Sequence, residues 1–165
     1  MLSNDELEAN NRRFSAAFTG GRLDSPPARK LVVLTCMDAR IDPLRMLGLR
    51  DGDAHILRNA GGRASDDAIR SIVISQQLLG TRHVLVIHHT ECGLFNVTND
   101  ELRQRFAGTL GPGVARMDFL PLGPDVRESV RVEVQDLRRH PLLAADTRVQ
   151  GYMYDVSTGR ITAVD

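Results

Sequence analysis

The sequence lacks the features that mark several large classes of protein. It has only two cysteines, too few for a disulfide framework, and no tryptophan. Basic and acidic residues number 21 each, so the basic surface typical of nucleic-acid binding is not expected. No apolar run approaches the roughly 18 residues of a membrane helix, and the acidic N-terminus has no apolar signal core. We therefore expect a cytoplasmic protein with reduced thiols that binds neither nucleic acid nor membrane.

The remaining composition is that of an ordinary globular protein. Of the 165 residues, 42% are hydrophobic and 25% are charged, which argues against a disordered chain. The length suits one domain, so we expect residues 1–165 to fold as a single unit. Residues 3–6 have the form Ser-x-x-Glu, a capping box, which predicts a helix over 3–19 that would be available as an oligomer arm.

Apolar runs and helical patterns alternate along the rest of the chain. The predicted strands are residues 31–35, 54–58 and 83–88. The first and third contain continuous apolar runs, as in sheets that are covered on both faces. Helical spacing and capping residues predict helices over 65–79, over 124–139 and, more briefly, from Asp42-Pro43 through Leu47, and residues 98–101 form another capping box, Thr-x-x-Glu.

The C-terminal part predicts a hairpin. Residues 148–155 and 160–164 flank a Ser-Thr-Gly turn, while the Gly- and Pro-rich stretch 108–123 predicts an irregular loop. The fold class that follows is α/β, with a mainly parallel central sheet flanked by helices and an antiparallel edge from the C-terminal hairpin. Ligands of such folds usually bind beyond the carboxyl ends of the strands.

One such strand end carries the sequence CMDAR at residues 36–40. Alternate residues of an extended chain point the same way, so Cys36, Asp38 and Arg40 would share one face. Asp38 and Arg40 are expected to form a charge-assisted pair, which would keep the carboxylate ionised and fix its direction.

The second such segment is HHTECG at residues 88–93. His89 and Cys92 have a usable spacing for two ligands on one turn, and Cys36 would supply a third from a neighbouring strand end. Thiolate and imidazole together suit zinc, and three protein ligands leave one position open, as in catalytic zinc sites. Neighbouring residues of a strand face opposite ways, so spacing alone does not decide between His88 and His89.

Each of these features also has a structural explanation. A free cysteine is most often a small buried apolar group, and a single His-x-x-Cys is a weak signal. Gly61-Gly62 predicts a tight turn, whose amides could also face a ligand. Two other functions remain open: a zinc protein without turnover, and a redox protein that pairs Cys36 with Cys92. The open coordination position argues against the first, and the missing Cys-x-x-Cys motif against the second.

Taken together, the motifs resemble those of the β-class carbonic anhydrase family, in particular its short, minimal clade. They are Cys-x-Asp-x-Arg at 36–40, Arg-Asn-Ala-Gly-Gly at 58–62 and His-x-x-Cys at 89–92. The strong likeness runs over residues 31–93. The resemblance implies one domain with that family's α/β fold, working as a homodimer or higher homo-oligomer.

The same resemblance implies roles for individual residues. One Zn²⁺ per subunit would be bound by three ligands, Cys36, His89 and Cys92, which selects His89 over His88. Asp38 and Arg40 would be the catalytic dyad beside the metal. The implied reaction is the reversible hydration of carbon dioxide to bicarbonate by a zinc-bound hydroxide. As a separate hypothesis, the amide of Gly61 would donate a hydrogen bond to the substrate.

Three further expectations follow. One branch of the family binds inhibitory bicarbonate beside a tryptophan three residues before the first cysteine; Val33 stands there, so that pocket is not expected. Two thiolate ligands cancel the charge of the zinc ion, which predicts an alkaline activity optimum. The same site could hydrolyse carbonyl sulfide or carbon disulfide instead, and we expect the loop 108–123 to decide between these substrates.

Overall fold

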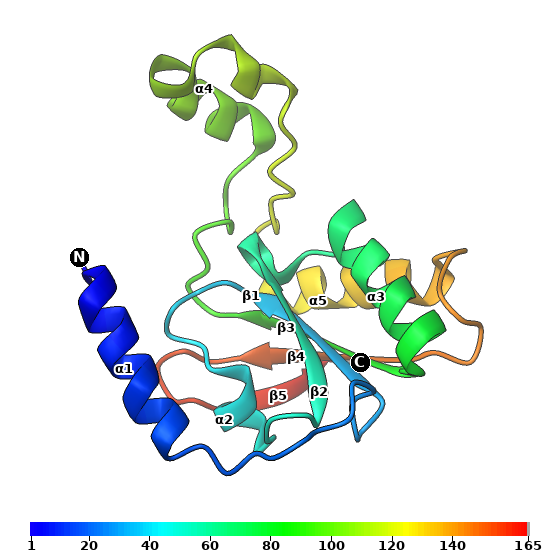
Figure 1. Cartoon of the computed structure of the whole chain (residues 1–165). Coiled ribbons are helices and arrows are strands. Elements are labelled where there is room, and N and C mark those ends of the chain that lie inside the picture. The colour runs from blue at the N-terminus through cyan, green and yellow to red at the C-terminus, as the bar shows by residue number, and fades with distance from the viewer. Residues whose placement is uncertain (165) are drawn as a thin grey trace.

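A five-stranded sheet lies at the centre of the computed structural model, which describes residues 1–164 (Figure 1). The strands, in the order in which they lie side by side, are β2 (Ala54–Asn59), β1 (Leu31–Cys36), β3 (His83–His89), β4 (Arg148–Tyr154) and β5 (Ile161–Val164). The first four are parallel to their neighbours, and β5 is antiparallel to β4. The predicted α/β class and its antiparallel C-terminal edge are therefore confirmed.

The two longest apolar runs became the inner strands of the sheet. Every residue of β1 is buried, and so is every residue of β3 except His83. Val32 and Leu34 belong to a core that includes residues of the helices α3 (Asp66–Leu79) and α5 (Val126–Arg139). Leu31 and Val33 pack in a second core on the other face. Burial on both faces explains why these strands show no alternation of apolar and polar residues.

Helices cover both faces of the sheet. The helices are α1 (Asn4–Ala16), α2 (Pro43–Leu47), α3 (Asp66–Leu79), α4 (Asn99–Leu110) and α5 (Val126–Arg139), with 3₁₀ turns η1 (Ala60–Gly62) and η2 (Pro112–Arg116). Helices α3 and α5 lie against one face (Figure 1). Met46 and Leu47 of α2 pack in the core of the opposite face. Among the described residues, no helix is long and apolar enough to cross a membrane.

Two sequence predictions are wrong in detail. The first helix begins as predicted, with the Ser3–Glu6 capping box formed, but it ends at Ala16 rather than near residue 19. The stretch 108–123 is not irregular throughout, because α4 continues to Leu110 and η2 follows at once. The reason lies upstream: a capping box of Thr98 and Glu101 starts α4, and the helix tolerates a glycine near its end.

Two helices stand apart from the sheet. In Figure 1, α1 lies to one side of the body, and α4 with η2 projects from one edge of it. Helix α1 buries no residue, its Phe14 is 60% exposed, and Phe18, which follows the helix, is 49% exposed. The projecting segment rejoins the body where Phe95 lies beside Gly123. Its own interior contains the ring pair of Phe106 and Phe119, with centroids 5.5 Å apart.

Candidate functional site

The carboxyl ends of β1 and β3 bring three potential metal ligands together. The ligand atoms of Cys36, His89 and Cys92 all lie within 4.8 Å of one another, and all three residues are buried. Cys36 is the last residue of β1 and His89 the last of β3, and these strands are parallel neighbours. After β3 the chain turns at Glu91, whose φ is +57°, and this turn brings Cys92 back to the cluster.

His89 is oriented as a metal ligand would be. Its Nδ1 lies 2.8 Å from the carbonyl oxygen of Thr90, so this nitrogen carries the proton and donates it there. Its Nε2 is buried and has no hydrogen-bond partner. A buried polar atom without a partner is costly, and a metal ion would satisfy it. Two sulfurs and one imidazole nitrogen fit zinc, so the residues present suit this ion.

The neighbouring histidine serves a different purpose. His88 is fully buried, with Nδ1 2.8 Å from Ser129 Oγ and Nε2 3.3 Å from the Gly62 carbonyl oxygen. Burial lowers the pKa of His88 to about 4, so its ring is neutral near pH 7. His88 thus joins β3 to α5 and to the glycine turn, while His89 joins the cluster.

The cluster concentrates negative charge on one sulfur. The hydrogen bond from Cys92 lowers the pKa of Cys36 to about 4 against the effect of burial. His89 and the amides of Asp38 and Gly61 also lower this pKa. The same hydrogen bond and burial raise the pKa of Cys92. Burial lowers the pKa of His89, but the nearby Cys36 sulfur and its negative charge produce a net rise. Even without a metal, the site favours a thiolate that would attract a cation.

Asp38 and Arg40 form the expected pair beside the cluster. Arg40 donates from Nε to Asp38 Oδ1 at 3.0 Å and from Nη2 to Oδ2 at 2.8 Å, a bidentate contact. Side-chain and backbone hydrogen bonds from Arg40 hold the pKa of Asp38 well below its usual range. Asp38 Oδ2 lies 3.8 Å from His89 Nε2. The pair arises in a turn, because the extended chain ends at Cys36 and the predicted alternation does not continue.

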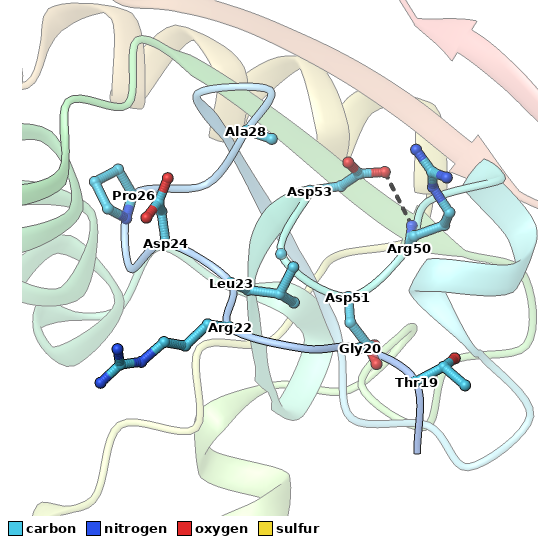
Figure 2. A pocket seen from close by; sticks show the side chains of 11 residues that line it. Thr19, Gly20, Arg22, Leu23, Asp24, Pro26, Ala28, Arg50, Asp51 and Asp53 are labelled. Atoms are coloured by element: carbon cyan, nitrogen blue, oxygen red, sulfur yellow. Dashed lines mark hydrogen bonds between the residues drawn. The ribbon is translucent and has the colours of Figure 1, made fainter. Parts of the chain in front are cut away.

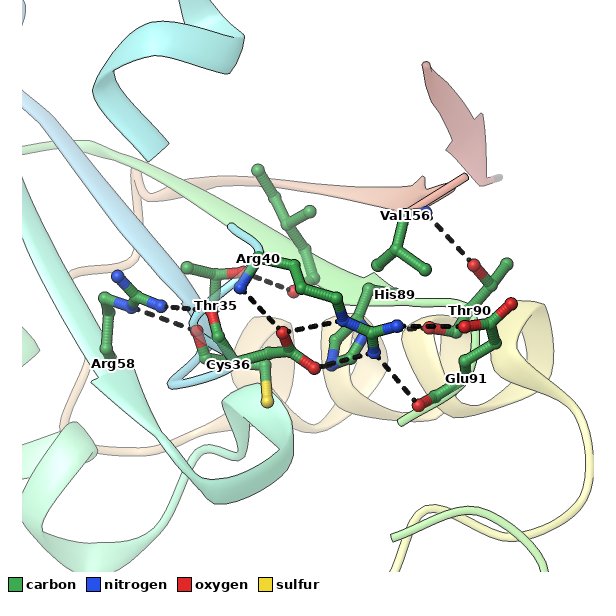
Figure 3. A network of polar contacts seen from close by, with 10 residues as sticks. Thr35, Cys36, Arg40, Arg58, His89, Thr90, Glu91 and Val156 are labelled. Carbon is green, nitrogen blue, oxygen red and sulfur yellow. Dashed lines mark hydrogen bonds and ion pairs between the residues drawn. The ribbon is translucent and has the colours of Figure 1, made fainter. Parts of the chain in front are cut away.

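Sequence reasoning missed two residues that contact this pair (Figure 3). Arg58 donates to the carbonyl oxygens of Cys36, at 3.0 Å, and Asp38, at 2.7 Å. Glu91 accepts from Arg40 Nη1 at 2.9 Å. The pairing of β1 with β2 places Asn59 beside Cys36, so a known register would have indicated Arg58. No pattern in the sequence indicates the contact of Glu91.

The glycine turn η1 packs directly against the end of β1. Gly62 has φ +70°, and a Cβ added there would lie 2.9 Å from the backbone nitrogen of Cys36. The turn is tied at its ends by Asn59, which accepts from the Arg63 amide at 2.7 Å. Arg63 also forms an ion pair of 2.6 Å with Glu133, which is almost fully buried. The amide of Gly61 faces the Cys36 sulfur, and its contact with a substrate stays a prediction.

The surroundings of the cluster are apolar. Cys36 and Cys92 belong to a buried set that they share with Leu31, Val33, Ile41, Leu85, Ile87, Leu122 and Tyr154. A pocket of about 610 Å³ lies elsewhere (Figure 2). It is lined by residues 19–28 and 50–53, which precede β1 and β2, so it lies at the opposite end of the parallel strands. None of its lining residues is a cysteine or histidine.

Comparison with known proteins places this geometry in context. The carbonic anhydrase family matches residues 31–117 of the chain. Beta-carbonic anhydrase 1 of Mycobacterium tuberculosis is 38% identical over 165 residues, covering 99% of each chain. A carbon disulfide hydrolase of Acidianus sp. is 36% identical, covering 82% of this chain and 78% of its own. The crystal structure of carbonic anhydrase from Streptococcus mutans superposes with a TM-score of 0.91 at 41% identity, covering 100% of this chain and 99% of its own.

Proposed function

The chain belongs to the β-carbonic anhydrase family, a family of lyases, and from this premise we propose that it catalyses the reversible hydration of carbon dioxide to bicarbonate. The observation that carries the proposal is the buried cluster of Cys36, His89 and Cys92, placed beside an ionised Asp38. We further propose that this cluster holds one Zn²⁺ per subunit. The unpartnered Nε2 of His89 and the thiolate at Cys36 support this ion.

The residues around the cluster divide the chemistry between them. When bound, zinc supplies a Lewis acid that lowers the pKa of a coordinated water. Asp38 is positioned to accept a hydrogen bond from the attacking water and so to orient its lone pair towards the substrate carbon. Arg40 keeps Asp38 ionised and directed. The apolar neighbours suit a small apolar substrate, because they exclude bulk water and have no polar groups that need a hydrogen bond from the substrate.

The direct test is stopped-flow hydration of carbon dioxide with a pH indicator, using zinc-replete protein at neutral and alkaline pH. We expect fast hydration that is strongest at alkaline pH, because two thiolates offset the charge of a dication and weaken its acidifying effect on water. Zinc bound without hydration at either pH would refute the proposal and favour a zinc protein without turnover. Rates that are already constant from acidic pH upwards would contradict the argument from two thiolates.

Arg40→Ala is expected to reduce turnover with little loss of zinc. Asp38 then loses a bidentate partner and with it the restraint on its direction. We expect kcat to fall by about 100-fold, the lower end of what a positioned proton acceptor contributes. Arg70→Ala is the matched control, because it removes an exposed arginine that pairs with Asp67 at 2.8 Å on α3. Equal rates in the two variants would remove the Asp38–Arg40 pair from the mechanism.

Hydrolysis of carbon disulfide or carbonyl sulfide is a second candidate function. The Acidianus relative, named as a carbon disulfide hydrolase, supports it at 36% identity. Both molecules have the linear shape of carbon dioxide, and the same three ligands would serve either reaction. We propose that residues 108–123 influence the choice, since Leu122 of this stretch lies in the apolar core around the cluster. Release of hydrogen sulfide from carbon disulfide, faster than hydration, would support this candidate over the first.

We also propose that the protein is a homodimer or higher homo-oligomer that uses α1 as an arm. The support is that α1 buries nothing in its own chain while its apolar side chains Leu7 and Phe14 are 50% and 60% exposed. A helix of this kind gains most of its stability from packing against a partner. Sedimentation of the chain with and without residues 1–18 tests the proposal. The same number of subunits per assembly in both forms would contradict it.

A further inference from the structure

Arg40 is held from two sides. On one side the Asp38 carboxylate accepts hydrogen bonds from Arg40 Nε and Nη2. On the other side the Glu91 carboxylate accepts a hydrogen bond from Arg40 Nη1 at 2.9 Å. Its Nη2 also lies 3.3 Å from the backbone carbonyl oxygen of Glu91. All three nitrogens of the guanidinium group are therefore engaged, although the Arg40 side chain is 46% exposed. An exposed arginine with a single partner would retain much of its rotational freedom.

The backbone at Glu91 is shaped for this contact. Its φ of +57° is uncommon for a residue with a side chain, and such conformations persist where the surrounding structure fixes them. The turn directs both the carboxylate and the carbonyl oxygen of Glu91 to Arg40, as Figure 3 shows. A glycine would suit this φ better, yet it would remove the carboxylate.

Asp38 has two directions open to it. Its Oδ2 lies 3.8 Å from the unpartnered Nε2 of His89, so this carboxylate is close to where a metal ion would sit. Both of its oxygens are bound by Arg40, so the direction of the carboxylate depends on the guanidinium group. Anything that fixes Arg40 therefore also fixes Asp38.

We propose that Glu91 is a positioning residue that clamps Arg40 and thereby keeps Asp38 directed at the attacking water. This inference rests on the proposed hydration of carbon dioxide. Glu91 itself touches neither the substrate nor the metal ligands' donor atoms; it acts through the guanidinium group. Without its carboxylate, Arg40 spends more time away from Asp38, and Asp38 is then free to turn towards the metal.

The test compares Glu91→Gln with Glu128→Gln in the zinc-loaded, full-length protein. The control is closely matched, because the two side chains are 62% and 61% exposed and each pairs with an arginine, at 2.9 and 2.7 Å. The first readout is hydrogen exchange of the Arg40 Nε–H, followed by NMR, and the second is kcat and KM for hydration. For Glu91→Gln we expect exchange to quicken and kcat to fall, each by about fivefold, with KM within about twofold. For Glu128→Gln we expect both readouts to match the wild type.

A second variant separates positioning from folding. Glu91→Gly removes the carboxylate but suits the positive φ, so we expect the melting temperature to be retained while Arg40 exchange and kcat change as in Glu91→Gln. Wild-type exchange at Arg40 in either variant overturns the inference, and so does a lower kcat with unchanged exchange. If the wild type itself hydrates no carbon dioxide, the proposed function fails. The exchange of Arg40 then decides the inference alone, because it does not depend on turnover.

Discussion

Cys36→Ser is expected to abolish tight zinc binding and, with it, hydration. The hydrogen bond from Cys92 lowers the pKa of Cys36 to about 4, so its sulfur is a thiolate at neutral pH and ready to bind a cation. A serine hydroxyl has nearly the same shape but stays protonated and is not a usual zinc ligand. We expect zinc affinity to fall by more than about 100-fold, beyond the loss that follows from removing a residue that only hydrogen-bonds to a metal ligand. Metal content after dialysis and the hydration rate measure the two effects.

The control for this substitution is the adjacent residue. Thr35 is as buried as Cys36, and its hydroxyl donates to the Ile87 carbonyl oxygen at 2.8 Å. Neighbouring residues of a strand point to opposite faces, so Thr35→Val disturbs the same strand without removing a ligand. We expect this variant to lose some stability and to keep its zinc. If Thr35→Val loses as much zinc as Cys36→Ser, the effect belongs to the packing of β1 and the ligand role of Cys36 is wrong.

The sheet could be predicted because short apolar runs of the sequence indicate its inner strands. The run from Leu31 to Leu34 and the run before His88 are apolar without interruption, and both lie in inner strands whose residues are buried except for His83. The hairpin of β4 and β5 followed from turn residues in the same way. Helix α4 extended further than Gly108 in its last turn and the following Gly111-Pro112 suggested, because the capping box at its start outweighs local propensity.

The site was predictable only where its residues are close in sequence. Asp38 and Arg40 are two residues apart, and the expected ion pair is present. The contact of Arg40 with Glu91 joins residues 51 positions apart. It also depends on the positive φ of Glu91, which is not expected for a glutamate. The choice between His88 and His89 likewise depended on which of the two faces of the sheet carries the cluster. In the structure His88 contacts the hydroxyl of Ser129 on α5, and His89 is the histidine that joins the cluster.

Gly62→Ala is expected to weaken zinc binding although the residue contributes no ligand. A Cβ at this position would lie 2.9 Å from both the Cys36 nitrogen and the Thr35 carbonyl carbon. Both are backbone atoms in the most buried strand of the sheet, so neither can rotate away as a side chain would. Either η1 or the end of β1 must shift, and the Cys36 sulfur moves with it. We expect a loss of stability of about 1–3 kcal/mol and a loss of zinc affinity of about 10- to 100-fold.

Gly80→Ala separates the two causes of this effect. Gly80 also has a positive φ, +73°, but no atom lies within 4 Å of the position its Cβ would take. It therefore carries the same conformational cost, about 1 kcal/mol, without a collision. Thermal unfolding and zinc titration of both variants should show a similar backbone cost, with weakened zinc binding in Gly62→Ala alone. Equal zinc affinity in the two variants would mean that the ligand geometry at Cys36 does not depend on the close approach of the glycine turn.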